Sequence, residues 1–177
     1  MKNKTLIIPA ILFFFILFIL FYLLLIERKP SELPSVLINK KVPVFKAESL
    51  LNDNIFISEK EFKNELTIVN FFATWCKPCL DEHAYLKRLS IGKNLKIIGI
   101  NYKDDPKKAI KWLKELGNPY YDVLADYDAR IGIDWGVYGL PETFIINSKG
   151  IIKYRLVGPI TEKNYDMFKL KIIETNQ

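Results

Sequence analysis

The longest hydrophobic stretch of the chain lies near its N-terminus, where residues 6–26 carry no charged side chain. With a rise of about 1.5 Å per residue, a helix of this length spans about 30 Å and can cross a bilayer once. The stretch is longer than the apolar region of a cleaved signal peptide, and it ends in the charged residues 27–29 rather than a small-residue cleavage site. We therefore expect residues 1–27 to form an uncleaved membrane anchor.

The segment after this anchor lacks the periodicity of a helix or a strand. Residues 28–41 include Pro30 and Pro34, which favour an extended tether between the anchor and a folded domain. Positive charges flank the apolar stretch on both sides, so the charge rule favours a cytoplasmic N-terminus only weakly. The folded domain is expected to occupy residues 42–177.

Within this domain the hydrophobic spacing alternates between strand and helix. Residues 67–74 form a nearly continuous β-branched and aromatic run, typical of a strand that is buried on both faces. Residues 80–89 have helical spacing, and Gly92 is suited to a left-handed cap at the end of that helix. Residues 96–102 predict a second strand, and residues 104–116 predict a capped helix with proline near its start. The order predicts a βαβα unit with two parallel strands.

The last third of the chain has a different order of elements. It predicts two strands, at 143–147 and 151–156, joined by a Ser-Lys-Gly hairpin, and a closing helix at 165–173. Two further short strands are expected near Val44 and Ile55. A βαβ unit joined to a ββα unit implies a central mixed sheet with helices on both faces. This is an α/β architecture of the thioredoxin type.

Composition narrows the class of protein. Half of the 177 residues are hydrophobic and 14% are aromatic, so the chain behind the apolar stretch can bury the core of one domain. The formal net charge is +6, but the lysines alternate with acidic residues and form no block with interleaved aromatics. We therefore expect no binding of nucleic acid.

The two cysteines of the chain, Cys76 and Cys79, stand where a strand gives way to a helix. The start of a helix stabilises a thiolate, because its free N–H groups and partial positive charge favour the anion. Cys76 is therefore expected to be the exposed, attacking thiol and Cys79, about one turn further on, the resolving thiol. Pro78 fixes the backbone between them. Lys77 either adds a positive charge that modestly favours the thiolate or is a plain surface residue.

Other uses of a CxxC pair fit the sequence less well. Structural zinc needs four ligands, and beyond the cysteines only His83 and carboxylates are available. Covalent haem attachment needs a histidine after the second cysteine, where this chain has Leu80. A static disulfide would close too small a loop to restrain the unfolded chain much, and a peroxidase would need a separate resolving cysteine. No metal or other cofactor is expected.

Residues 69–79, which read VNFFATWCKPC, resemble the thioredoxin-like proteins, and further segments narrow the resemblance to the CcmG/DsbE family of cytochrome c maturation. These segments are residues 81–83, 101–105, 112–120 and 136–144. The resemblance covers about residues 40–170, and the apolar N-terminus also fits it. It implies a single-pass protein of the inner membrane with its domain on the periplasmic side.

The resemblance also implies a function. Family members reduce disulfides in the CxxCH sites of apocytochrome c, or in a CcmH-like partner thiol protein, with electrons from a membrane transporter of the DsbD or CcdA kind. The geometry of a CxxC pair is shared by oxidants and reductants, so the reducing direction comes from the resemblance alone. Two alternatives stay open: a general periplasmic thioredoxin-like reductase, and a membrane-tethered metal chaperone with the cysteines as soft ligands. A monomer is the default expectation.

The family's motifs also suggest roles for residues around the dithiol. Pro141 matches the family's cis proline, which faces the dithiol and leaves nearby backbone free for an extended substrate. Glu82 and Glu142 match acidic residues that would oppose thiolate formation, although Glu82 could also be an ordinary acid in the first turn of a helix.

Asn70 stands where ordinary thioredoxins have a buried Asp, and the family often has Asn there. Trp75, Tyr138 and Leu140 are expected to shape a substrate-binding surface, with plain packing as the alternative for Trp75 and Tyr138. His83 is expected to be a helix residue beside the site rather than a ligand.

Overall fold

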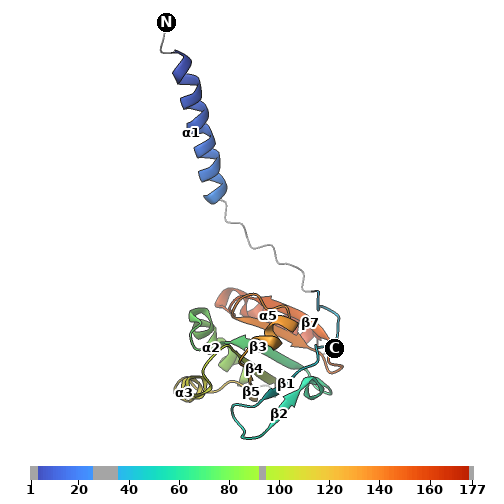
Figure 1. Ribbon diagram of the computed structural model, residues 1–177. Coiled ribbons are helices and arrows are strands. Elements are labelled where there is room, and N and C mark those ends of the chain that lie inside the picture. The colour runs from blue at the N-terminus through green and yellow to red at the C-terminus, as the bar shows by residue number, and fades with distance from the viewer. Residues whose placement is uncertain (1–3, 26–35, 92–94, 176–177) are drawn as a thin grey trace. The chain divides into compact units, whose positions relative to one another are not determined.

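The structure, a computed structural model, describes residues 4–25, 36–91 and 95–175 (Figure 1). The chain divides into two compact units, residues 1–33 and 34–177. The first unit contains helix α1 (Lys4–Leu25), which includes Pro9. Within the described residues, no helix meets the length and apolarity required to span a membrane. Most of the tether expected at 28–41 lies outside the described residues.

The second unit is built on a five-stranded mixed sheet. Its strands are β3 (Thr67–Phe72), β4 (Lys96–Tyr102), β5 (Asp122–Asp126), β6 (Glu142–Ile146) and β7 (Ile152–Val157). They lie in the order β5-β4-β3-β6-β7, with β3, β4 and β5 parallel and β6 and β7 antiparallel to their neighbours. The predicted thioredoxin-like α/β fold is therefore confirmed.

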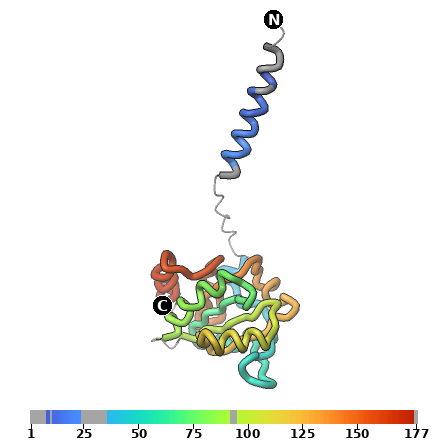
Figure 2. Tube along the Cα trace, turned by 90° about the vertical axis from the view of Figure 1, so that its left-hand side faces the viewer, coloured from blue at the N-terminus to red at the C-terminus, as the bar shows by residue number. Residues whose placement is uncertain are grey.

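Helices cover the two faces of this sheet unequally. The long helices α2 (Lys77–Ser90), α3 (Pro106–Leu116) and α5 (Glu162–Thr175) pack through one hydrophobic cluster on the same face, and Figure 2 shows α2 in green and α3 in yellow toward the viewer. The other face is covered by smaller elements. These are the short helix α4 (Arg130–Asp134), the 3-10 helix η1 (Glu59–Phe62) and strand β1 (Lys46–Glu48).

Local sequence explains most of these elements. All six residues of β3 are buried, as its continuous apolar run predicts. Helix α3 begins with Pro106, and the side chain of Asp105 caps it by accepting the N–H of Lys107. Helix α2 ends at Ser90 with Ile91 as its cap residue, while the expected cap Gly92 lies outside the described residues.

The buried face of α2 differs from the apolar spacing that predicted the helix. Leu80 is 41% exposed, whereas Glu82 and His83 are buried beside Cys79, Leu86 and Leu89. The buried Glu82 is bonded to Asn70 of β3 and to the backbone N–H of Ile160, so hydrogen bonds compensate for its burial on the face toward the sheet. A polar residue thus occupies a core position that the pattern assigned to Leu80.

Strand β5 of the sheet and helix α4, which covers one of its faces, were not predicted. Strand β5 has only five residues, with an aspartate at each end, and it adds a third parallel strand at the edge of the sheet. Helix α4 has five residues and follows Ala129, whose φ of 64° is unusual for a residue with a side chain. The early strands exist, but β1 and β2 (Phe56–Ser58) pair with each other in a separate two-stranded sheet.

An aromatic stack on the α2–α3 face surrounds Gly99 of β4. Phe72 stacks on Trp112 and on Tyr120, with ring centroids 5.7 and 5.0 Å apart. A Cβ at Gly99 would lie 2.9 Å from Cε1 of Phe72 and 3.2 Å from the ring of Tyr120. The glycine therefore provides the space that the stack occupies.

Candidate active site

Cys76 and Cys79 form a disulfide bond at the start of α2, with the sulfurs 2.02 Å and the Cα atoms 5.3 Å apart. Cys76 is the N-cap residue of the helix, and its Sγ accepts a hydrogen bond of 3.2 Å from the N–H of Cys79. Pro78 lies in the first turn, where its missing N–H costs no helical bond. The helix start thus offers the Cys76 sulfur a donor that would stabilise a thiolate in the reduced form.

The expectation that Cys76 is exposed is wrong for this oxidised form. Cys76 is 6% and Cys79 is 2% exposed, and both belong to the hydrophobic cluster under α2. The N–H of Cys76 donates to the carbonyl oxygen of Ala73 at 3.2 Å. Cys76 remains the more accessible of the two. Lys77 is exposed and forms an ion pair with Asp81 one turn along, which offsets the positive charge expected beside the thiols.

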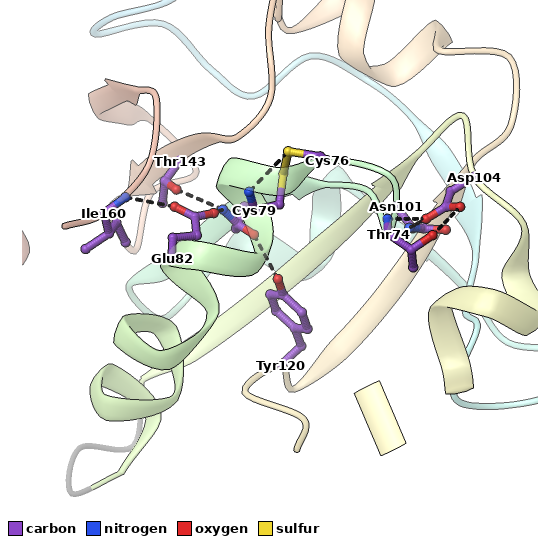
Figure 3. The surroundings of a disulfide bond; sticks show 10 residues. Thr74, Cys76, Cys79, Glu82, Asn101, Asp104, Tyr120, Thr143 and Ile160 are labelled. Carbon is purple, nitrogen blue, oxygen red and sulfur yellow. Dashed lines mark hydrogen bonds between the residues drawn. A yellow bond between two sulfur atoms is a disulfide. The ribbon is translucent and has the colours of Figure 1, made fainter. Parts of the chain in front are cut away.

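Glu82 lies one turn beyond Cys79 and is completely buried, so it is not a surface acid of the first turn. Its Oε1 accepts the side-chain amide of Asn70 at 2.8 Å, and its Oε2 accepts the backbone N–H of Ile160 at 2.9 Å. The amide of Asn70 also donates to Thr143, and its oxygen accepts the hydroxyl of Tyr120 at 2.8 Å (Figure 3). We call these five residues the Glu82 network.

Burial determines the charge state of this network. Loss of solvation raises the pKa of Glu82 from 4.5 to about 8, although the donors from Ile160 and Asn70 act in the opposite direction. The carboxyl is therefore mostly protonated at neutral pH. Burial, with a smaller contribution from Glu82, also raises the pKa of Tyr120 well above its usual value, so the phenol stays neutral.

Glu142 is equally buried but has a cation beside it. Its Oε2 accepts Nε and Nη2 of Arg155, both at 2.7 Å, and its Oε1 accepts the N–H groups of Tyr138 and Gly139 at 3.1 and 3.3 Å. Burial raises the pKa of Glu142, while these N–H groups and the charge of Arg155 lower it. Arg155 also donates to the carbonyl of Gly136 at 2.9 Å. The Glu142–Arg155 pair thus holds the loop of residues 136–139.

The side chains expected to meet a substrate differ in exposure. Trp75 and Tyr138 are 61% and 55% exposed, and the guanidinium of Arg155 lies 4.9 Å from the ring centroid of Tyr138. Leu140 is half-buried against both hydrophobic clusters, and the Leu140–Pro141 peptide bond is cis. The substrate-binding roles of these residues stay predictions.

His83 is part of the packing between α2 and α3. Its Nε2 lies 2.8 Å from the carbonyl oxygen of Gly117, and its ring makes an edge contact with Trp112 at a centroid distance of 4.3 Å. Burial lowers the pKa of His83. In the part of the chain that the structure describes, no three His, Cys, Asp or Glu side chains come together as a set of metal ligands.

Three residues of the site were missed by sequence reasoning: Tyr120, Thr143 and Arg155. The strand registers contain the signal for two of them. Thr143 is the direct partner of Asn70 in the antiparallel β3–β6 pairing, and Arg155 pairs with Phe144, two residues from Glu142 on the same strand. Residues two apart on one strand lie on the same face, so the hairpin register would have brought Arg155 near Glu142.

Comparison with known proteins gives a consistent set of relatives. A family model described as Redoxin matches residues 37–169. The thiol:disulfide interchange protein DsbE of Escherichia coli (strain K12) is 44% identical over 170 residues, covering 94% of this chain and 91% of that protein. The protein of the same name from Pseudomonas aeruginosa is 42% identical over 163 residues, covering 92% of this chain and 89% of the relative.

Solved structures show the same fold. A crystal structure of a putative thiol:disulfide interchange protein DsbE from Chlorobium tepidum has a TM-score of 0.70, covering 78% of this chain and 96% of that one. Its sequence identity is 18%, so this likeness concerns the fold alone.

Proposed function

Because this chain belongs to the DsbE/CcmG family of thiol:disulfide interchange proteins, we propose that it reduces disulfides during cytochrome c maturation. The chain is a thiol:disulfide oxidoreductase of the DsbE type, with Cys76 and Cys79 as its redox-active pair. The reducing direction and the cytochrome substrate are the parts that we propose. Both are supported by membership of the family, and the observation that the Cys76 sulfur caps α2 supports the role of Cys76 as the attacking thiol.

The proposed reaction has two exchange steps. In the reduced protein the thiolate of Cys76 attacks one sulfur of the target disulfide, forms a mixed disulfide, and releases the other target sulfur as a thiolate that takes up a proton. The thiolate of Cys79 then attacks Sγ of Cys76 and releases the first target sulfur. Two electrons pass to the target, and the Cys76–Cys79 disulfide remains to be reduced again.

Glu82 is proposed to hold a proton beside Cys79. It follows Cys79 by one helical turn, it is buried, and its pKa of about 8 lies close to that of a cysteine thiol. An ionised carboxylate here would oppose formation of the Cys79 thiolate, and a protonated carboxyl would not. We assign Glu142 a comparable electrostatic effect on the dithiol, weakened by its ion pair with Arg155.

The substrate is proposed to bind as an extended segment against Pro141 and Leu140, flanked by Trp75 and Tyr138. This assignment rests on the family resemblance and on the exposure of the two aromatic rings. Exposed aromatic rings on an ordered loop offer large contact area at a low cost in side-chain entropy.

We further propose that residues 1–27 anchor the protein in the inner membrane, residues 28–41 form a periplasmic tether, and residues 42–177 form the thioredoxin-like domain on the periplasmic side. The uncharged run at 6–26 supports an anchor, because an apolar run of this length can cross a bilayer once as a helix. Electrons would then come from a membrane donor of the DsbD or CcdA type, and the target would be apocytochrome c or a CcmH-like thiol protein.

The function can be tested by trapping the target in cells. In Cys79→Ser the second exchange step cannot occur, so Cys76 should stay joined to its partner, and mass spectrometry then identifies the trapped protein. Capture of apocytochrome c or a maturation thiol protein would support the proposal. Capture of many unrelated envelope proteins would instead indicate a general periplasmic reductase.

A second variant controls for the assignment of the attacking thiol. Cys76→Ala should show neither trapped partners nor exchange turnover. If turnover persisted in this variant, Cys76 would not be the nucleophile.

A further inference from the structure

Two loops meet at the C-terminal end of the parallel strands β3 and β4, the end at which the dithiol lies. Strands β3 and β4 are parallel neighbours, and Phe72 of β3 pairs with Asn101 of β4. Parallel neighbours end at the same edge, so the loop from β3 to Cys76 and the loop from β4 to α3 leave the sheet side by side. The residues that connect them are Thr74 in the first loop and Asp104 in the second.

Asp104 binds Thr74 at two atoms. Its Oδ2 accepts the backbone N–H of Thr74 at 2.6 Å, and its Oδ1 accepts the hydroxyl of Thr74 at 2.8 Å (Figure 3). The same carboxylate accepts the side-chain amide of Asn101 at 3.0 Å and the N–H of Asp105 at 2.8 Å. Four donors thus fix the carboxylate, and two of them belong to one residue of the active-site loop. Paired bonds to one residue restrict its rotation as well as its position.

The next residue of the active-site loop is held by the same turn. The indole N–H of Trp75 donates to the carbonyl of Lys103 at 3.1 Å. Lys103 has a φ of 46°, and its own N–H donates to the carbonyl of Asp126 in β5 at 2.9 Å. The loop before Cys76 is therefore attached at two consecutive residues to a turn that is itself attached to the sheet.

These bonds serve the active-site loop rather than α3. The start of α3 has its own cap, since the side chain of Asp105 accepts the N–H of Lys107 at 2.9 Å. Thr74, in contrast, lies inside the turn that the N–H of Cys76 closes onto the carbonyl of Ala73. Fixing Thr74 fixes the conformation of this turn and with it the direction in which the Cys76 sulfur points.

We propose that Asp104 is a positioning residue for Cys76, acting through Thr74. Thiol-disulfide exchange needs the attacking sulfur in line with the bond that it breaks, so a loosened turn lowers the rate even when the thiolate is fully formed. The proposal rests on the exchange activity and on Cys76 as the nucleophile. It does not depend on which protein is the target, so a failure of the cytochrome proposal would leave it intact.

The test is the rate at which the reduced full-length protein reacts with the aromatic disulfide 5,5′-dithiobis(2-nitrobenzoic acid), followed over a range of pH. The plateau rate at high pH, where Cys76 is a thiolate, separates geometry from ionisation. Asp104→Ala should lower the plateau about tenfold, because misplacement of a reacting group by a fraction of an ångström has effects of this order. Asp104→Asn, which retains the shape and an acceptor oxygen, should recover part of the rate.

A double-mutant cycle tests the route through Thr74. Thr74→Val removes the hydroxyl but keeps the shape, and combining it with Asp104→Ala should slow exchange little beyond Asp104→Ala alone. Losses that multiply would show that the two residues act independently and would overturn the proposal. If Asp104→Ala does not fold, Thr74→Val is compared with Thr74→Ser, which keeps the hydroxyl. A lower plateau rate for Thr74→Val than for Thr74→Ser supports the proposal, and equal rates overturn it.

Ser49→Ala is the matched control for general destabilisation. The Ser49 hydroxyl donates to Asp122 at 2.6 Å and accepts the N–H groups of Leu51 and Asn52, so it also joins two segments at a polar centre. Asp122 is the first residue of the parallel strand β5. It therefore lies at the N-terminal end of the parallel strands, whereas the dithiol follows their C-terminal end. This variant should lose thermal stability while keeping the wild-type plateau rate. A plateau that falls as far as in Asp104→Ala, or an unchanged plateau in Asp104→Ala itself, would overturn the proposal.

Discussion

Glu82 and Glu142 are the same side chain at the same burial, 0% exposed, yet their surroundings differ in one respect. Glu82 is met by neutral donors only, from Asn70 and the backbone of Ile160. Glu142 is met by two backbone N–H groups and by the guanidinium of Arg155. A buried carboxylate without a cation is expensive, whereas one with a well-placed guanidinium recovers much of the cost as Coulomb energy.

The difference separates two uses of a buried acid. Glu82 can change its protonation state near neutral pH, because burial has brought its pKa to about 8. Glu142 instead orders a loop, since Arg155, Tyr138 and Gly139 all donate to it. A buried carboxyl thus titrates near neutral pH or anchors a loop according to whether a cation lies beside it.

Removing the cation should make Glu142 resemble Glu82. Arg155→Met leaves Glu142 buried without its partner, so the free energy of unfolding should fall by about 3–5 kcal/mol. The pKa of Glu142 should rise further, and the variant should therefore lose more stability at about pH 8 than at about pH 5. Urea unfolding at the two pH values measures both effects.

Arg88→Met is the control for this experiment. Arg88 and Glu162 are 3.9 Å apart with both side chains largely exposed, so their separation should cost less than about 1 kcal/mol. If Arg155→Met lost no more free energy of unfolding than Arg88→Met, the buried pair would contribute no more to stability than an exposed one.

Glu82→Gln should remove a pH dependence that the wild type has. The folded protein holds the Glu82 proton between the usual pKa of 4.5 and about 8, while the unfolded chain has lost it, so stability falls as pH rises through this window. The decrease should be about 3–4 kcal/mol from pH 5 to pH 8. Glutamine cannot ionise, so the melting temperature of Glu82→Gln should change less over this pH range than that of the wild type.

Glu115→Gln serves as the matched variant for Glu82→Gln. Glu115 is an exposed residue of α3, 3.8 Å from Lys111, and its replacement should leave the wild-type slope in place. Equal slopes for wild type and Glu82→Gln would show that the Glu82 carboxyl is already ionised in the fold.

The smallest change in stability is expected at Tyr138, an exposed ring that contacts the guanidinium of Arg155. The ring of Tyr138 lies over the guanidinium, and such a contact contributes about 0.5–1 kcal/mol at an exposed site. Tyr138→Leu should therefore reduce the free energy of unfolding by less than about 1 kcal/mol, measured by urea unfolding at neutral pH. A loss as large as that of Arg155→Met would mean that the ring, rather than the carboxylate, holds the arginine.

The sequence predicted those parts of the fold that depend on local chemistry. Strand β3 has an unbroken apolar run, and Asp105 with Pro106 starts α3. Strand β5 could not be predicted from its own five residues, because pairing with β4 is what makes them a strand. In the site, the cysteine motif is local and was found. The other four members of the Glu82 network come from four separate segments that only the fold brings together.

Burial of charge was the second limit on prediction. An acid at a helical position next to a leucine is normally on the surface, and nothing in residues 80–82 indicates that Glu82 takes the core position and Leu80 the exposed one. The NYKDD segment at 101–105 was recognisable as a motif. The bonds of Asp104 to Thr74 could not be predicted, because they join two loops that only the fold brings together.

The aromatic stack around Gly99 has a consequence for the inheritance of this protein. A methyl group at position 99 would press on Phe72, which is held between Trp112 and Tyr120 and has little room to yield. The displacement would pass to Tyr120 and from its hydroxyl to Asn70, the residue that contacts Glu82. An allele encoding alanine at this position would therefore disturb the surroundings of Glu82 from a residue that carries no functional group, and we expect selection to act against it.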